Sequence, residues 1–118
     1  MEATRLTNLE VTGALKVVGG IAGTLSGVTL TKSGNYTLAE SEKVFYIGIT
    51  LSAASKTVTL DLPTGAVCVV VNEGGTNAFT LKNVSGDSGT SIAAGKAYLV
   101  RASQTANSSK LTLLNDGT

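Results

Sequence analysis

The feature that most constrains this chain is a run of short β-type segments, cut at regular intervals by small polar loops, that extends from Val58 to Leu114. The segment 57–62, TVTLDL, alternates apolar and polar side chains and therefore predicts a strand with one buried face. Pro63 has no N–H to donate and ends this strand, and Gly65 turns the chain. Strands at roughly ten-residue spacing with turn signals between them are typical of antiparallel sandwiches and barrels. The sequence thus predicts an all-β fold, a small antiparallel β-sandwich or barrel, and does not decide between sandwich and barrel.

The same pattern begins at Val28, and its segments can be assigned one by one. We expect two short strands around a turn at 33–35, a single helical turn at 39–43, and strands within 44–52, 57–62, 66–71, 78–84, 98–102 and 110–114. The segment 66–71, AVCVVV, is apolar on both faces, which predicts a central strand. Phe45 and Phe79 are expected in the core.

Composition narrows the function classes. Charged residues make up 14% of the chain, well below the roughly 25% of a typical soluble domain, and Ser, Thr, Asn and Gly supply the polar surface instead. The net charge is +1 and Lys and Arg do not cluster, which argues against a nucleic-acid partner. We find neither a secretory signal nor an apolar run of the ~18 residues that a membrane span needs. The expectation is synthesis in a cytoplasm and no membrane partner.

The inventory of reactive side chains argues against an enzyme. Histidine is absent, and the single cysteine, Cys68, lies in an apolar strand where a buried inert thiol is expected. Four carboxylates, Asp61, Glu73, Asp87 and Asp116, are each isolated at a turn or strand edge, so no pair of carboxylates is indicated for acid–base work. No metal-ligand spacing is present, and the 86–89 loop is better explained as a plain loop than as a calcium site. We expect no cofactor, no metal and no catalytic residue.

The first 27 residues differ from the rest. Glycine recurs every few positions among β-branched residues, which disfavours a continuous helix. The segment is too short to bury its own apolar residues, so we interpret 1–27 as an arm that packs on a partner, and 28–118 as an outward β domain; a frayed arm is the plain alternative. The residues expected to make the contact are Leu6, Leu9, Val11, Leu15, Val17 and Ile21.

The order of strand ends and turns resembles a β domain that recurs in bacteriophage virion proteins, in tail fibres, head fibres and capsid decoration proteins. The matching residues cover about half of the chain: Leu62-Pro63, Gly65, Val67, Val69, Val71-Asn72, Gly75-Thr76-Asn77, Thr80-Leu81, Gly86-Asp87-Ser88, Ile92, Gly95, Leu99-Val100 and Leu111 to Leu114. One departure is the end of the domain, where relatives often have Asn-Trp and this chain has Ser109-Lys110 before its last strand. The opening segment TRLTNLEVTGALKVVGGI is similar to the capsid-attaching segment of phage head-fibre proteins.

The resemblance implies a structural protein on the capsid exterior of a virion, a head-fibre or capsid decoration protein. It implies the major capsid protein as partner and a homotrimer whose arms interleave, with glycines such as Gly13 and Gly19 allowing close approach. A trimer at a three-fold lattice position would multiply the weak contact of each arm by avidity. The chain is short for a tail fibre, which favours the head protein.

The alternative is a receptor- or glycan-binding module of a phage tail fibre that contacts a host-surface glycan. Saccharide sites usually stack sugars on clustered aromatic rings, and this chain has only five such residues. Tyr36 and Tyr98 are the candidates for that role.

Overall fold

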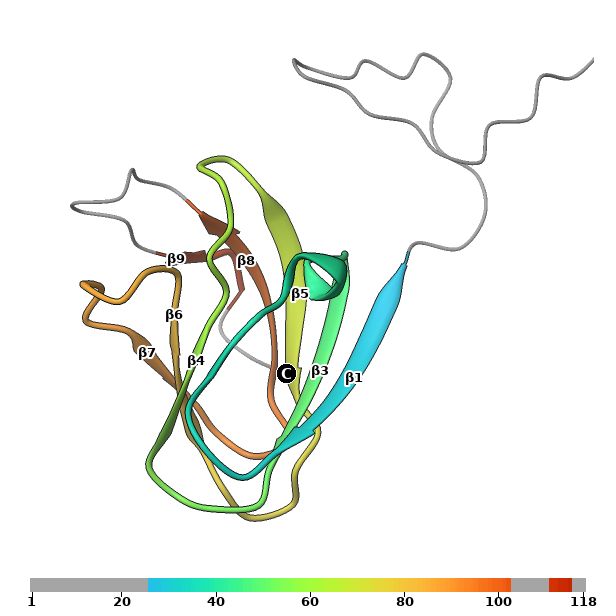
Figure 1. Cartoon of the computed structure of the whole chain (residues 1–118), viewed down its shortest axis with the longest axis vertical. Helices are drawn as coiled ribbons and strands as arrows, with labels where there is room; N and C mark the ends of the chain where they lie inside the picture. The colour runs from blue at the N-terminus through green and yellow to red at the C-terminus, as the bar shows by residue number, and fades with distance from the viewer. Residues whose placement is uncertain (1–25, 103–110, 116–118) are drawn as a thin grey trace, which may run out of the picture.

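The computed structural model describes residues 26–102 and 111–115 (Figure 1). Within them lie nine strands and one short 3-10 helix, η1. The elements are β1 (Gly27–Lys32), β2 (Tyr36–Thr37), η1 (Glu40–Glu42), β3 (Tyr46–Leu51), β4 (Lys56–Thr59), β5 (Val67–Asn72), β6 (Phe79–Lys82), β7 (Thr90–Ile92), β8 (Ala97–Ala102) and β9 (Leu111–Leu113). The all-β prediction is confirmed, and the expected helical turn at 39–43 is η1.

The strands form two sheets. Sheet A has the order β1-β3-β5-β8-β9, and sheet B has the order β2-β4-β6-β7. The two sheets lie side by side (Figure 1). The inward side chains of both sheets meet in one core. Among the described residues the sheets do not close into a barrel, so the sandwich is the observed alternative. As predicted, the AVCVVV segment is a central strand, β5.

The expected antiparallel pairing is wrong for the first six strands, which alternate between the sheets. Two reversals carry the chain from one sheet to the other and back, so it returns in its original direction. In consequence β1, β3 and β5 are parallel, as are β2, β4 and β6. Gly27 lies opposite Tyr46, and Tyr46 lies opposite Val69, so successive coils take 19 and 23 residues (from 27 to 46 and from 46 to 69).

Only the C-terminal part follows the antiparallel expectation. The chain doubles back after β6, and β7 pairs antiparallel with β6, β8 with β5, and β9 with β8. The sheets are therefore mixed: a coil of parallel strands that ends in antiparallel ones.

The core is aliphatic, as the composition requires. Phe79 is its one fully buried aromatic ring among the described residues. Each aliphatic side chain buried there contributes roughly 1.5–3 kcal/mol. The buried apolar residues are Leu30, Leu38, Ile47, Ile49, Leu51, Val58, Leu60, Cys68, Val70, Phe79, Leu81, Ile92, Val100 and Ala102.

The prediction that Phe45 lies in the core is wrong, because this residue, just before β3, is 37% exposed. A second correction concerns the predicted 57–62 strand, which ends at Thr59. Asp61 has a φ of 54°, in the left-handed region that breaks a strand. The backbone N–H groups of Asp61 and Leu62 donate instead to the backbone oxygen and Oδ1 of Asn83.

Asparagine side chains hold the loops to the strands. Asn72, at the end of β5, is fully buried, and its side chain makes three hydrogen bonds. Its Nδ2 donates to the carbonyl oxygens of Asn77 at 2.9 Å and Ile92 at 3.0 Å, and its Oδ1 accepts from Gly74 N at 3.0 Å. One amide thereby ties the β5–β6 loop to the end of β7.

Candidate interaction surfaces

The residues that the sequence singles out for contact lie outside the described residues. Leu6, Leu9, Val11, Leu15, Val17 and Ile21 all belong to the segment 1–25. The division into an arm at 1–27 and a domain at 28–118 likewise stays a prediction, although β1 begins at Gly27, next to the expected boundary.

Reactive groups do not gather in the described part of the chain. No three His, Cys, Asp or Glu residues lie together there in a way that could hold a metal ion. The Cys68 thiol is buried, and this burial raises its pKa to about 11, so the thiol stays protonated at neutral pH. None of the described helices is long and apolar enough to span a membrane.

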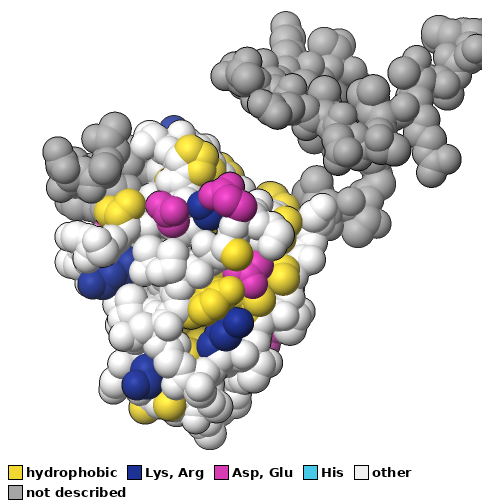
Figure 2. Space-filling model, viewed as in Figure 1, with side chains coloured by type: hydrophobic (Ala, Val, Ile, Leu, Met, Phe, Trp, Pro, Cys, Tyr) yellow, Lys and Arg dark blue, Asp and Glu magenta, His cyan; other side chains and the backbone are white. Residues whose placement is uncertain are grey.

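The carboxylates have local partners. Glu42 accepts a hydrogen bond from the Tyr36 hydroxyl at 2.5 Å, which lowers the pKa of Glu42 and raises the pKa of Tyr36. The Lys43 ammonium lies between Glu40 and Asp61, and its hydrogen bond to Glu40 is the main cause of its raised pKa. On the face that Figure 2 displays, acidic side chains lie beside a basic one in the upper part of the domain, and other Lys and Arg side chains are spread below them.

The two tyrosines considered for sugar stacking are both engaged. The Lys32 Nζ lies 4.1 Å from the centre of the Tyr36 ring and covers one face of it. Tyr98 pairs with Val70 in β5 and packs against the core. Contacts within the protein therefore occupy one face of the Tyr36 ring and hold the Tyr98 side chain against the core.

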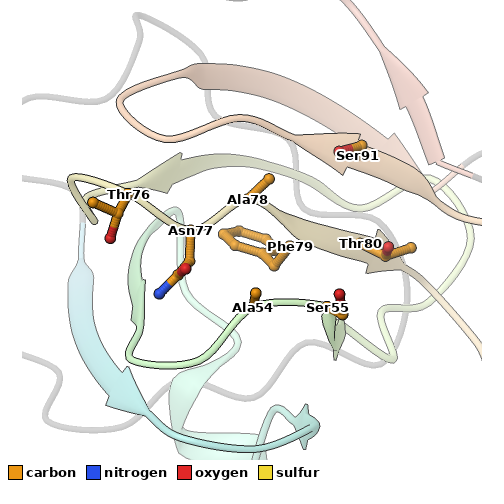
Figure 3. Close-up of a pocket in the computed structure, with 8 residues that line it drawn as sticks. All are labelled: Ala54, Ser55, Thr76, Asn77, Ala78, Phe79, Thr80 and Ser91. Carbon is orange, nitrogen blue, oxygen red and sulfur yellow. The ribbon is translucent and has the colours of Figure 1, made fainter.

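The surface of the described residues includes two hollows. The first, of about 320 Å³, lies between the β3–β4 and β5–β6 loops and the ends of β6 and β7, and Figure 3 shows its lining. The Asn77 side chain at the polar rim of this hollow is held in place, because its Nδ2 donates a hydrogen bond to the Leu51 carbonyl oxygen. The residues that line it are Ala54, Ser55, Thr76, Asn77, Ala78, Phe79, Thr80 and Ser91.

The second hollow, of about 300 Å³, lies over the outer face of sheet B and includes Tyr36 and Lys82. That face carries hydroxyl groups in register: Thr57 is opposite Thr80, which is opposite Ser91, and Thr37 is opposite Thr59. We call the outward residues of sheet B the threonine face; they are Thr37, Thr57, Thr59, Thr80, Lys82 and Ser91. It can exchange hydrogen bonds with polar ligands or water.

The outer face of sheet A has the opposite character. Val67 is 42% exposed and Leu114 is 50% exposed, and half-buried apolar side chains lie between them. We call this surface the valine face; it consists of Tyr46, Val67, Val69, Val71, Ala97, Leu99 and Leu114. Sequence reasoning missed it, because AVCVVV is apolar on both faces and its pattern does not say which face lies outward.

The valine face is bordered by Glu73. A Cβ atom at Gly48 would collide with the Glu73 carboxylate, so glycine is what lets this carboxylate lie over β3. Glu73 Oε2 accepts a hydrogen bond from the Tyr46 hydroxyl at 2.8 Å, and this bond raises the pKa of Tyr46.

Comparison with models of known families, with curated proteins and with solved structures finds no match to this chain.

Proposed function

We propose that this chain is a non-enzymatic structural protein of a bacteriophage virion, a head-fibre or capsid decoration protein that binds the capsid exterior. Its expected benefit is stabilisation of the capsid, contact with the host surface, or both. Segment 1–27 would bind the major capsid protein, and the β domain would face outward.

The observation that carries this proposal is that polar side chains of the segment resembling virion proteins form hydrogen bonds with the protein's own backbone. The Asn72 side chain donates to the backbone oxygens of Asn77 and Ile92, and the Asn77 side chain donates to that of Leu51. Asp87 accepts from Asn83 N at 3.2 Å. These side chains hold the backbone of turns and strand ends, which is what a structural module requires.

The arm supplies the attachment. Apolar arm residues such as Leu9 and Val11 would be buried between three copies and the capsid, and a homotrimer would match a three-fold lattice position. Avidity then holds the protein on the lattice even where each arm binds weakly.

The second candidate is a receptor- or glycan-binding module. It is favoured by the hollow on the threonine face, where Thr37, Thr59 and Lys82 offer hydroxyl and ammonium groups to a sugar. It is disfavoured by Lys32, which already covers the Tyr36 ring on one face. Glycan-array screening of the full chain, with Thr59→Ala as the variant, separates this candidate from the first.

The test of the proposal is attachment to capsids that lack this protein. The full chain should co-sediment with them, and a form lacking residues 1–25 should stay in the supernatant while keeping its β circular dichroism spectrum. The double variant Leu9→Asp with Val11→Asp in the full chain should also lose attachment. Its matched control is Thr29→Asp on the exposed face of β1, which should still attach. A truncated form that decorates capsids as well as the full chain would refute the role of the arm.

A further inference from the structure

The valine face is continuous across β3, β5 and β8 and extends to Leu114, just after β9. Tyr46 is opposite Val69, Val69 is opposite Leu99, and Leu114 N donates to the Leu99 carbonyl oxygen. The neighbouring outward row continues the apolar surface, with Val71 opposite Ala97. Cross-strand neighbours on one face lie about 4.5–5.5 Å apart, so these side chains touch one another rather than being scattered. A contiguous apolar surface of this kind marks an interaction site.

The charges that border this face have opposite signs at opposite ends of β5. The Glu73 carboxylate lies over β3, beyond the C-terminal end of β5. Arg101 is exposed and is opposite Val67, the first residue of β5. Neither side chain forms an ion pair within residues 26–102 and 111–115, although Glu73 accepts the Tyr46 hydrogen bond. The two charges therefore remain available to a partner.

We propose that the valine face binds the valine face of a second copy of this chain, with the two β5 strands running in opposite directions. A two-fold axis that lies in the interface and crosses β5 reverses the strand direction. It therefore brings Glu73 of each copy toward Arg101 of the other, and both pairs form at once. A three-fold axis along the strands would instead gather three Arg101 side chains at one end and three Glu73 carboxylates at the other, which like-charge repulsion opposes.

The size of the face sets the strength of this contact. Four neighbouring chain segments about 4.8 Å apart and six residues long cover a patch of roughly 20 by 20 Å. Stable complexes bury about 800 Å² per partner, so a patch of roughly 400 Å² places this pair among the weak, concentration-dependent interfaces. Copies held side by side on a lattice would pair far more readily than copies in dilute solution, because their effective concentration is high. The inference does not rest on the proposed function, since the face would pair wherever copies are concentrated.

The experiment is sedimentation velocity of the full chain over about 5 to 500 µM, a range that brackets weak association. The wild-type mass should double as concentration rises. In Val69→Lys, which places a charge in the middle of the face, the mass should stay constant. The matched control, Thr57→Lys on the threonine face, should associate like the wild type. Thermal melts establish that all three fold. If the arms already join three chains, the mass should rise from that of three chains to that of six.

Charge reversal provides the second readout. Arg101→Glu and Glu73→Arg should each weaken association, and the double variant should restore it, because the two opposite charges exchange places. A wild-type mass that stays constant up to the highest concentration overturns the proposal, and so does Val69→Lys associating like the wild type. Capsid attachment through the arm is measured separately and should be unchanged in Val69→Lys, so failure here is distinguishable from failure of the proposed function.

Discussion

Replacing Asn72 by alanine should be among the most damaging single changes in the domain. The Asn72 side chain is fully buried and joins three backbone groups: the carbonyl oxygens of Asn77 and Ile92 and the N–H of Gly74. The variant leaves all three without this partner. An unsatisfied buried group costs about 1–3 kcal/mol. The bonds to Asn77 and Gly74 are only part-buried, so water can replace part of their energy, whereas the bond to Ile92 is buried.

We therefore expect Asn72→Ala to lower the free energy of unfolding by about 3–5 kcal/mol, out of the 5–15 kcal/mol that native domains have. For a domain of this size that is a fall in Tm of roughly 15–25 °C. The assay is urea unfolding followed by circular dichroism, with a thermal melt beside it.

The matched control is Asn35→Ala. Its Oδ1 accepts a single exposed hydrogen bond, from Thr57 N at 2.9 Å, so the same chemical change should cost only about 0.5–1.5 kcal/mol. An Asn72→Ala variant within 1 kcal/mol of the Asn35→Ala variant would refute the reasoning, because burial and bond number would then not decide the cost.

Three further predictions follow from packing and titration. Gly89→Ala should destabilise the fold by about 1–3 kcal/mol in urea unfolding, because Gly89 has a φ of +80° and a Cβ there would lie 2.5 Å from Thr80 Cγ2; Gly34→Ala, with nothing within 4 Å, should be near neutral. Phe79→Ala should cost about 3–5 kcal/mol through the cavity it opens, measured in the same way, and a loss below 1 kcal/mol would contradict the core assignment. Burial raises the pKa of the Cys68 thiol from 9.0 to about 11, so the unfolded chain loses this proton first; stability should be unaffected below pH 9 and fall as the pH rises from 9 to 11, and a Cys68→Ala variant should show a smaller fall over that range.

Much of the fold could be predicted from local patterns. The alternation in 57–62 identified Val58 and Leu60 as core residues, because the two-residue period of a strand sends alternate side chains to one side. The turn at 33–35 and the helical turn at 39–43 were also predicted, since their residues act within a few positions of the chain.

Pairing between strands could not be predicted in the same way. A turn signal indicates that the chain reverses. It does not indicate whether the next strand pairs with the preceding strand or lies in the other sheet. The coils also differ in length, from 27 to 46 and from 46 to 69, so no repeat period is visible in the sequence. No local pattern marked Asn72 and Asn83 as buried residues, and only the structure places them inside the fold.

Side-chain chemistry and periodicity are properties of neighbouring residues, so the sequence by itself determined the aliphatic core, the buried thiol and most of the strands, although not β7. Only the tertiary structure decided that β1, β3 and β5 lie parallel and that Val69 and Val71 face outward while Cys68 and Val70 face the core. An apolar strand such as AVCVVV has two equivalent faces until a second sheet covers one of them. The physical reason is that burial depends on which distant segment packs against a face, and that choice is made between sheets rather than along the chain.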